Sequence, residues 1–269
     1  MIRTLVRNVL HESLNRRGGL VLLLGGFSIP LMIWISARFA VENGVKVVYT
    51  VGSTKPTDPI LFAGSMLSAL ISVAGDVWLM VSVFALSGLM TSHFEKGYLE
   101  LLLARPLGRV RLLAGRTLGI LMLCYLSLAL MLVPIVSWFY SHVSFPLEGK
   151  FRALALILVT YFIMISIMQL FAVLQPNPAV VVLASYAMVV LSGSLRQRET
   201  LATLVDTLWF KKTLESLYYV MPKFPEMSRI VSRLSGNHPV DSWMPVWSSF
   251  LFAVGCWVLT LSVFKRRSY

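Results

Sequence analysis

The sequence predicts an all-α polytopic membrane protein with six transmembrane helices, built as a single transmembrane domain over residues 1–269. The first observation is composition: 57% of the residues are hydrophobic and 13% are charged, whereas soluble domains are about half apolar and about a quarter charged. The second is that the apolar residues gather in six long runs. A soluble core of this size could not bury so much apolar surface, so a lipid bilayer is the expected solvent.

Residues 1–17 are expected to form an amphipathic helix that lies in the lipid headgroup layer. Arg3, Arg7 and His11 share one face, while apolar side chains recur at helical spacing on another. The pair Gly18–Gly19 would lead this helix into the first span. A cleaved signal peptide is the alternative, since small residues follow in SARFA, but the apolar run is too long for one. The apolar positions are Ile2, Leu5, Val6, Val9, Leu10 and Leu14.

Six runs are long enough to cross a bilayer, because a hydrocarbon core about 30 Å thick needs about 20 apolar residues of helix. The second run is long enough to tilt or to project beyond the bilayer. The fourth and fifth are separated only by QPNP at 175–178, whose two prolines cannot continue a helix and predict a tight turn. The predicted spans are 19–37, 60–90, 117–139, 153–174, 179–194 and 246–264.

Two connecting segments are expected to carry structure on the outer side. Loop 38–58 contains GVKVVYTVGSTKP, which predicts a short hairpin. Segment 195–245 contains two helical stripes, the second of which follows Pro225 and stops before Gly236, where start and stop signals belong. Two short helices that lie on the outer leaflet or dip into it are therefore expected. Their apolar residues are Leu201, Leu204, Val205, Leu208, Trp209, Leu217 and Tyr218, then Met227, Ile230, Val231 and Leu234.

The basic residues favour a cytoplasmic membrane protein with both termini in the cytoplasm. The chain holds 24 Lys and Arg against 12 Asp and Glu. In this orientation the inner segments hold 12 basic residues, and the short outer loops hold five. The long outer segment 195–245 holds seven further basic residues, mixed with five acidic ones. Short loops decide orientation under the positive-inside rule. Because the basic residues flank apolar runs, their expected partner is membrane lipid and not nucleic acid.

No residue pattern typical of a catalytic or metal site is present. Cys124 and Cys256 lie inside apolar runs without a C-x-x-C partner, so they are expected to pack and indicate neither a disulfide nor zinc. His142 and His238 both fall on the outer side, without carboxylates at ligand spacing. Ser/His/Asp, Cys/His and H-E-x-x-H sets are missing from the sequence. We therefore expect no enzyme activity, cofactor or metal in this chain.

Asp76 is the only acid inside a predicted span, where a charge costs about 2.5–3.5 kcal/mol at the helix centre on insertion scales. Gly64, Ser68, Ser72 and Asp76 follow one another at four-residue steps on one helix face. Small residues at that spacing let helices approach closely. Two interpretations stay open: the stripe lines a translocation path, or it is a packing seam in which Asp76 bonds to a neighbouring helix.

Residues 93–116, HFEKGYLELLLARPLGRVRLLAGR, interrupt the apolar chain between the second and third spans. Gly97 offers a break, and Pro106 disfavours helix at Arg105. Between them lie about two turns of helix. A short amphipathic helix parallel to the membrane is expected, either covering the bundle or docking a partner. Its clustered side chains would be Tyr98, Leu101 and Leu102.

This stretch resembles the cytoplasmic segment of type-2 ABC exporter permeases, the family that includes the permease of nitrous-oxide reductase maturation. F-E-K-G-Y-L-E-L-L-L-A-R-P-L-G-R presents an acidic residue, a glycine, Glu-Leu-Leu, a proline and a basic residue in the family's order. The six spans, the interfacial first helix, YYVMPKFPEM at 218–227 and the closing FKRRSY also fit. The matching residues are Glu95, Gly97, Glu100, Leu101, Leu102, Pro106 and Arg109.

The resemblance implies a permease subunit that exports a substrate by alternating access. A second permease chain would complete a homodimer or heterodimer. Each chain would dock a cytoplasmic ABC ATPase subunit through the short helix within residues 93–116, which we call the coupling helix. Glu95 and Glu100 would position that helix, while Tyr98, Leu101 and Leu102 would fill the ATPase groove. ATP and Mg²⁺ are expected on the partner subunit, because this chain has no G-x-x-x-x-G-K-[ST] loop to cradle phosphates.

Two other classes stay open at the level of the sequence. The first is a membrane enzyme or assembly factor with Asp76 as its catalytic acid, which a second carboxylate opposite Asp76 would favour. The second is a stand-alone secondary carrier. Such a carrier would be coupled to a proton or sodium gradient and would usually hold more charged groups at mid-membrane.

Overall fold

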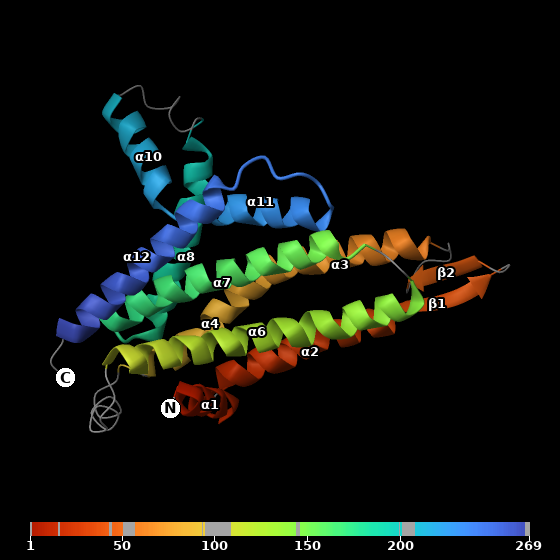
Figure 1. Ribbon diagram of the computed structural model, residues 1–269, viewed down its shortest axis with the longest axis horizontal. Helices are drawn as coiled ribbons and strands as arrows, with labels where there is room; N and C mark the ends of the chain where they lie inside the picture. The colour runs from red at the N-terminus through yellow and green to blue at the C-terminus, as the bar shows by residue number, and fades with distance from the viewer. Residues whose placement is uncertain are drawn as a thin grey trace.

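The computed structural model is an elongated bundle of helices with a β-hairpin at one end (Figure 1). Within the described part of the chain, six helical segments are long and apolar enough to cross a membrane. The expectation of a polytopic, mainly helical membrane protein is therefore confirmed. The structure describes residues 2–15, 17–42, 45–50, 57–92, 94, 109–143, 146–198, 200 and 208–266.

The N-terminal helix packs along the bundle. α1 (Ile2–Asn15) precedes α2 (Arg17–Ser36), the first span, and lies against α2 and α6 (Arg109–His142). Val9 is buried on Gly119 of α6, where an added Cβ would lie 2.7 Å from the Val9 Cβ. Glycine at 119 therefore allows α1 to approach α6 closely. The predicted helix is confirmed, whereas its place in the headgroup layer stays a prediction.

The hairpin is formed by β1 (Ala37–Glu42) and β2 (Val45–Thr50), which pair antiparallel with Ala37 opposite Thr50. The structure thus has a hairpin in the predicted loop, and VKVVYT from GVKVVYTVGSTKP forms its second strand. Residues 51–56 lie outside the described residues. The first strand is ARFAVE, directly after α2, which ends at Ser36 and not at the predicted 37. Phe39 of that strand packs on Trp138 and Phe139 near the end of α6, with ring centroids 5.1 and 6.3 Å away. Phe39 stacks on His142 with ring centroids 4.4 Å apart, and the Lys46 Nζ donates to the His142 carbonyl at 2.9 Å.

The second span is interrupted near its middle. The span predicted at 60–90 is found at Pro59–Ser92. Within it, Asp76 separates α3 (Pro59–Gly75) from α4 (Val77–Ser92). Gly75 and Asp76 both have low helix propensity, which lowers the cost of a break here. Figure 1 shows α4 bending away from the direction of α3.

The third to fifth spans follow the predicted order. α6 is longer than the predicted 117–139, since it begins at Arg109 and ends at His142. α7 (Glu148–Leu174) and α8 (Pro178–Arg196) are joined by the predicted QPNP turn, which is confirmed. The Asn177 Oδ1 accepts from the Ala179 N–H at 3.0 Å and caps α8.

The chain after α8 holds α10 (Leu208–Val220), α11 (Phe224–Ser235) and the sixth span, α12 (Met244–Arg266). The predicted helix between Pro225 and Gly236 is thus confirmed as α11. Leu201, Leu204 and Val205, from the first predicted stripe, lie outside the described residues. The apolar face of α11 is buried against α7, α3 and α8, with Phe224, Met227, Ile230, Val231 and Leu234 forming that face.

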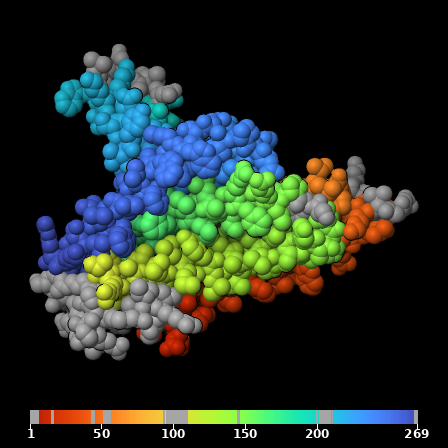
Figure 2. Space-filling view, in the orientation of Figure 1, coloured from red at the N-terminus to blue at the C-terminus, as the bar shows by residue number. Residues whose placement is uncertain are grey.

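α7 is the most buried of the six spans and contacts α3, α4, α6, α8, α11 and α12. In Figure 2 it lies between α6 on one side and α11 with α12 on the other. Polar side chains fasten the neighbouring spans together. The Trp78 Nε1 donates to the Ser127 Oγ at 3.0 Å, and the Ser127 Oγ donates to the Leu22 carbonyl at 2.8 Å. This chain of bonds links α4, α6 and α2.

Candidate functional site

The candidate site is built around the interruption at Asp76. The Asp76 N–H still donates to the Ser72 carbonyl at 3.0 Å, and the Met80 N–H reaches the Asp76 carbonyl at 3.3 Å. Tyrosines from two other spans brace the interruption on both sides. The Tyr161 hydroxyl donates to the Ala74 carbonyl at 3.1 Å, and the Tyr186 hydroxyl donates to the Met80 carbonyl at 3.0 Å. α7 and α8 therefore hold the two half-helices in place.

α11 supplies the partner of the carboxylate. The Ser228 Oγ donates to the Asp76 Oδ2 at 2.8 Å, across 152 residues of sequence. The start of α11 is fixed by hydroxyls from two spans. The Phe224 N–H donates to the Ser192 Oγ at 3.0 Å, and the Lys223 N–H donates to the Ser249 Oγ at 2.8 Å. These bonds satisfy buried N–H groups that have no partner within the helix, and they hold Ser228 in register with Asp76.

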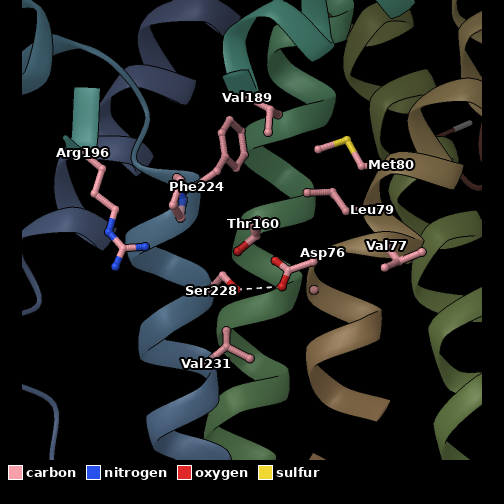
Figure 3. Close-up of a pocket in the computed structure, with 12 residues that line it drawn as sticks. Asp76, Val77, Leu79, Met80, Thr160, Val189, Arg196, Phe224, Ser228 and Val231 are labelled. Atoms are coloured by element: carbon pink, nitrogen blue, oxygen red, sulfur yellow. Dashed lines mark hydrogen bonds between the residues drawn. The ribbon is translucent and has the colours of Figure 1, made fainter. Parts of the chain in front are cut away.

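A pocket of about 460 Å³ lies beside this bond, and we call it the Asp76 pocket (Figure 3). Its wall is mostly apolar and comes from α3, α4, α7, α8 and α11. In Figure 3, Asp76, Thr160 and Ser228 lie at one part of the pocket, with Phe224 and Arg196 on the side toward the end of α8. The remaining lining residues are Gly75, Val77, Leu79, Met80, Val189, Pro225 and Val231.

The Asp76 pocket has the composition of a small-molecule or path-lining site. A few polar groups converge on an apolar wall, as is typical of ligand sites. Asp76 can accept hydrogen bonds or offset a positive charge, while Arg196 can do the reverse for an anionic group. Among the lining residues that the structure describes, Asp76 is the only acid. That arrangement suits the binding of a ligand with a polar or charged group.

Only part of the predicted stripe of small residues lies at this site. The Ser72 carbonyl accepts from Asp76, and the Ser68 Oγ lies 3.5 Å from the Ser235 carbonyl of α11. Gly64 behaves differently: an added Cβ would meet no described atom within 4 Å. In the described chain, α11 therefore approaches the stripe at Ser68 and Asp76, and Gly64 faces open space.

The predicted coupling residues lie at the edge of the described chain. Arg109 is the first residue of α6. Just before the gap, the Phe94 ring lies 5.8 Å from the Phe264 ring of α12. Glu95, Gly97, Tyr98, Glu100, Leu101, Leu102 and Pro106 lie outside the described residues.

Three polar residues of the Asp76 pocket are not predicted as site residues from the sequence: Thr160, Arg196 and Ser228. Thr160 is one hydroxyl in an apolar span, and its Oγ1 donates to the Leu156 carbonyl at 3.0 Å, as many intrahelical threonines do. Ser228 lies next to the buried stripe of α11, and no sequence pattern distinguishes it from other serines. Of the three, only Arg196 could have been singled out from the sequence, because an arginine at the end of a span often lies at the membrane interface.

Neither the models of known protein families nor the curated proteins compared with this chain give a match.

Proposed function

We propose that this chain is the membrane-spanning permease subunit of an ATP-driven exporter, which pairs with a second permease chain and docks a separate ABC ATPase. The substrate would cross by alternating access, in which the helices move between two arrangements as ATP binds and is hydrolysed on the partner. The resemblance of residues 93–119 to type-2 ABC exporter permeases supports this proposal.

The observation that carries the proposal is the packing of the helices that flank residues 93–119. The end of α4, the start of α6 and the end of α12 share one apolar cluster that contains Met90, Phe94, Leu112 and Phe264. α1 lies at this same end of the bundle (Figure 1). Residues 95–108 connect α4 to α6 here, so a partner docked on them could push directly on three spans.

The Asp76 pocket supports the transport part of the proposal. It lies among five helices, and its acid sits where α3 and α4 meet. Interrupted helices commonly supply binding sites in membrane transporters. The enzyme alternative would need a second acid near Asp76, and the described lining supplies none.

Purification from native membranes in mild detergent tests the proposal. We expect an ATP-binding protein to co-purify stoichiometrically, as mass spectrometry would reveal. The double substitution Leu101→Asp with Leu102→Asp should abolish this binding, because charges would replace the apolar groups expected in the ATPase groove. The control is Leu217→Asp on α10, a partly exposed leucine expected on the other side of the membrane.

Two results would contradict the proposal. One is a folded chain without an ATP-binding partner, and the other is a partner that the double variant retains. Transport in vesicles that needs a proton or sodium gradient but no ATP would favour the secondary carrier instead.

A further inference from the structure

A second pocket, of about 350 Å³, lies where the end of α8 meets α10, α11 and the start of α12, and we call it the arginine pocket. Four arginines from two regions of the chain line it: Arg196 and Arg198 from the end of α8, and Arg229 and Arg233 from α11. Arg229 and Arg233 are four residues apart and therefore share a face of α11, opposite its buried stripe. The other lining residues are Tyr218, Glu226, Ile230, Val240, Asp241, Ser242 and Pro245.

The two acids of the arginine pocket are already engaged by its own residues. The Tyr218 hydroxyl donates to the Glu226 Oε1 at 2.7 Å, and Asp241 pairs with Arg233. Burial, together with this bond to Glu226, raises the pKa of Tyr218, so its hydroxyl keeps the proton that it donates. Arg198 lies over the Tyr218 ring, 3.6 Å from the centroid.

The remaining arginines leave a positive surplus in the pocket. Four guanidinium groups face two carboxylates. Within the described chain, Arg196 and Arg229 form no hydrogen bond or ion pair, and both are exposed. Guanidinium groups bind phosphate through paired N–H donors, so several arginines that converge on one space suit a phosphate group.

The position of the pocket points to a lipid as the source of that phosphate. Arg196 is the last residue of one candidate span, and Met244 is the first residue of another, so the pocket lies at the ends of two spans. Trp243 and Trp247 follow the lining residues Ser242 and Pro245 closely in sequence, and their side chains are 48% and 66% exposed. Exposed tryptophans at span ends are typical of the membrane–water interface, where phospholipid headgroups lie. In Figure 2, α11 and the start of α12 form one continuous surface on this side.

We infer that the arginine pocket binds the phosphate group of an anionic phospholipid. A bound phosphate would tie α8 to α11, because Arg196 and Arg229 come from these two helices. Arg196 also lines the Asp76 pocket, so a lipid held here would lie beside the acid and its Ser228 partner. The inference rests on the described geometry alone and does not depend on an ATPase partner.

Lipid binding to the purified full-length chain tests the inference. Delipidated protein in detergent would be titrated with phosphatidylglycerol, phosphatidylcholine or inorganic phosphate, and binding followed by native mass spectrometry and thermal unfolding. We expect phosphatidylglycerol to bind at least about tenfold more tightly than phosphatidylcholine. The double substitution Arg196→Gln with Arg229→Gln should remove this preference. Arg38→Gln and Arg111→Gln, at exposed arginines outside the pocket, should keep it.

The outcomes separate the sources of phosphate. Equal binding of phosphatidylglycerol by wild type and the double glutamine variant would overturn the inference. If inorganic phosphate displaces phosphatidylglycerol and stabilises the protein alone, the site holds a free phosphate and the lipid assignment fails. If the glutamine variant does not fold, Arg196→Lys with Arg229→Lys replaces it. This pair should bind phosphatidylglycerol several-fold more weakly, since lysine lacks the paired donors, and unchanged affinity would contradict the inference.

Discussion

Asp76 is a carboxylate in an apolar layer, and its environment decides what it can do. Its described side-chain partner is a neutral hydroxyl, Ser228, so the carboxylate keeps an open oxygen for other donors. Arg196 lines the same pocket but forms no ion pair with it in the described chain. The Asp76 side chain is thus held in place by a hydrogen bond and has no described ion-pair partner. This arrangement suits a group that binds a ligand.

Replacing Ser228 by alanine should lower the free energy of unfolding by about 1 kcal/mol, because the hydrogen bond to the accessible Asp76 side chain is lost. Thermal unfolding in detergent would measure the change. Ser232→Ala is the matched control, one turn further along α11, since Ser232 is exposed and its side chain forms no hydrogen bond with a described residue. Equal stability losses in the two variants would show that the bond to Asp76 contributes nothing measurable.

At the scale of helices, contact between α1 and α6 depends on the absence of a side chain at Gly119. Gly119→Ala would place a Cβ 2.7 Å from the Val9 Cβ, and we expect a loss of about 1–3 kcal/mol from overpacking. Val9→Ala in the same chain should recover part of this loss by making room. A double-mutant cycle in thermal unfolding measures the coupling between the two sites.

Gly255→Ala on α12 provides the control for that cycle, because an added Cβ there meets no described atom within 4 Å. It should be neutral or stabilising by up to about 1 kcal/mol through helix propensity. A Gly119→Ala variant that is as stable as Gly255→Ala, or that Val9→Ala does not help, would contradict the packing of α1 against α6.

The helices show which features a sequence can predict. Hydropathy finds the six spans, and QPNP finds the turn before α8, because both signals are local. The interruption at Asp76 is missed, since Gly75 and Asp76 are two residues in a long apolar run and the bend depends on tyrosines from α7 and α8. The stripe of α11 predicts a helix, but its burial against α3 and α7 depends on contacts distant in sequence.

The candidate site is predictable only in part, for the same reason. Asp76 stands out from the sequence alone because an acid in a span is rare and costly. Its partner Ser228 and the lining residue Thr160 are ordinary hydroxyl residues that become significant only when α7 and α11 pack beside the second span. The coupling pattern at 95–108 is visible as sequence and stays a prediction.

At the scale of the whole molecule, the arrangement of spans predicts the side of the membrane on which each end lies. α1 and the end of α12 lie at one end of the bundle, and the hairpin lies at the other (Figure 1). In a chain with Cys124→Ala and Cys256→Ala, both buried thiols are removed. Arg38→Cys in the hairpin should then react with a membrane-impermeant maleimide in intact cells. Arg266→Cys at the end of α12 should react only after lysis.

The labelling has its own control and a clear contrary result. The chain with both native cysteines replaced and none added should not react, which shows that the signal comes from the introduced thiol. Reaction of Arg266→Cys in intact cells, with Arg38→Cys protected, would reverse the orientation that the basic residues favour.

The bond between Asp76 and Ser228 also has a consequence for how the protein is made. The two residues are 152 positions apart, so at synthesis rates of about 5–20 residues per second the serine follows the acid by on the order of ten seconds. During that interval the newly inserted second span carries its carboxylate without this partner. The apolar halves on either side of Asp76 must keep the span in the bilayer until α11 arrives. A segment made well after the second span therefore completes the site.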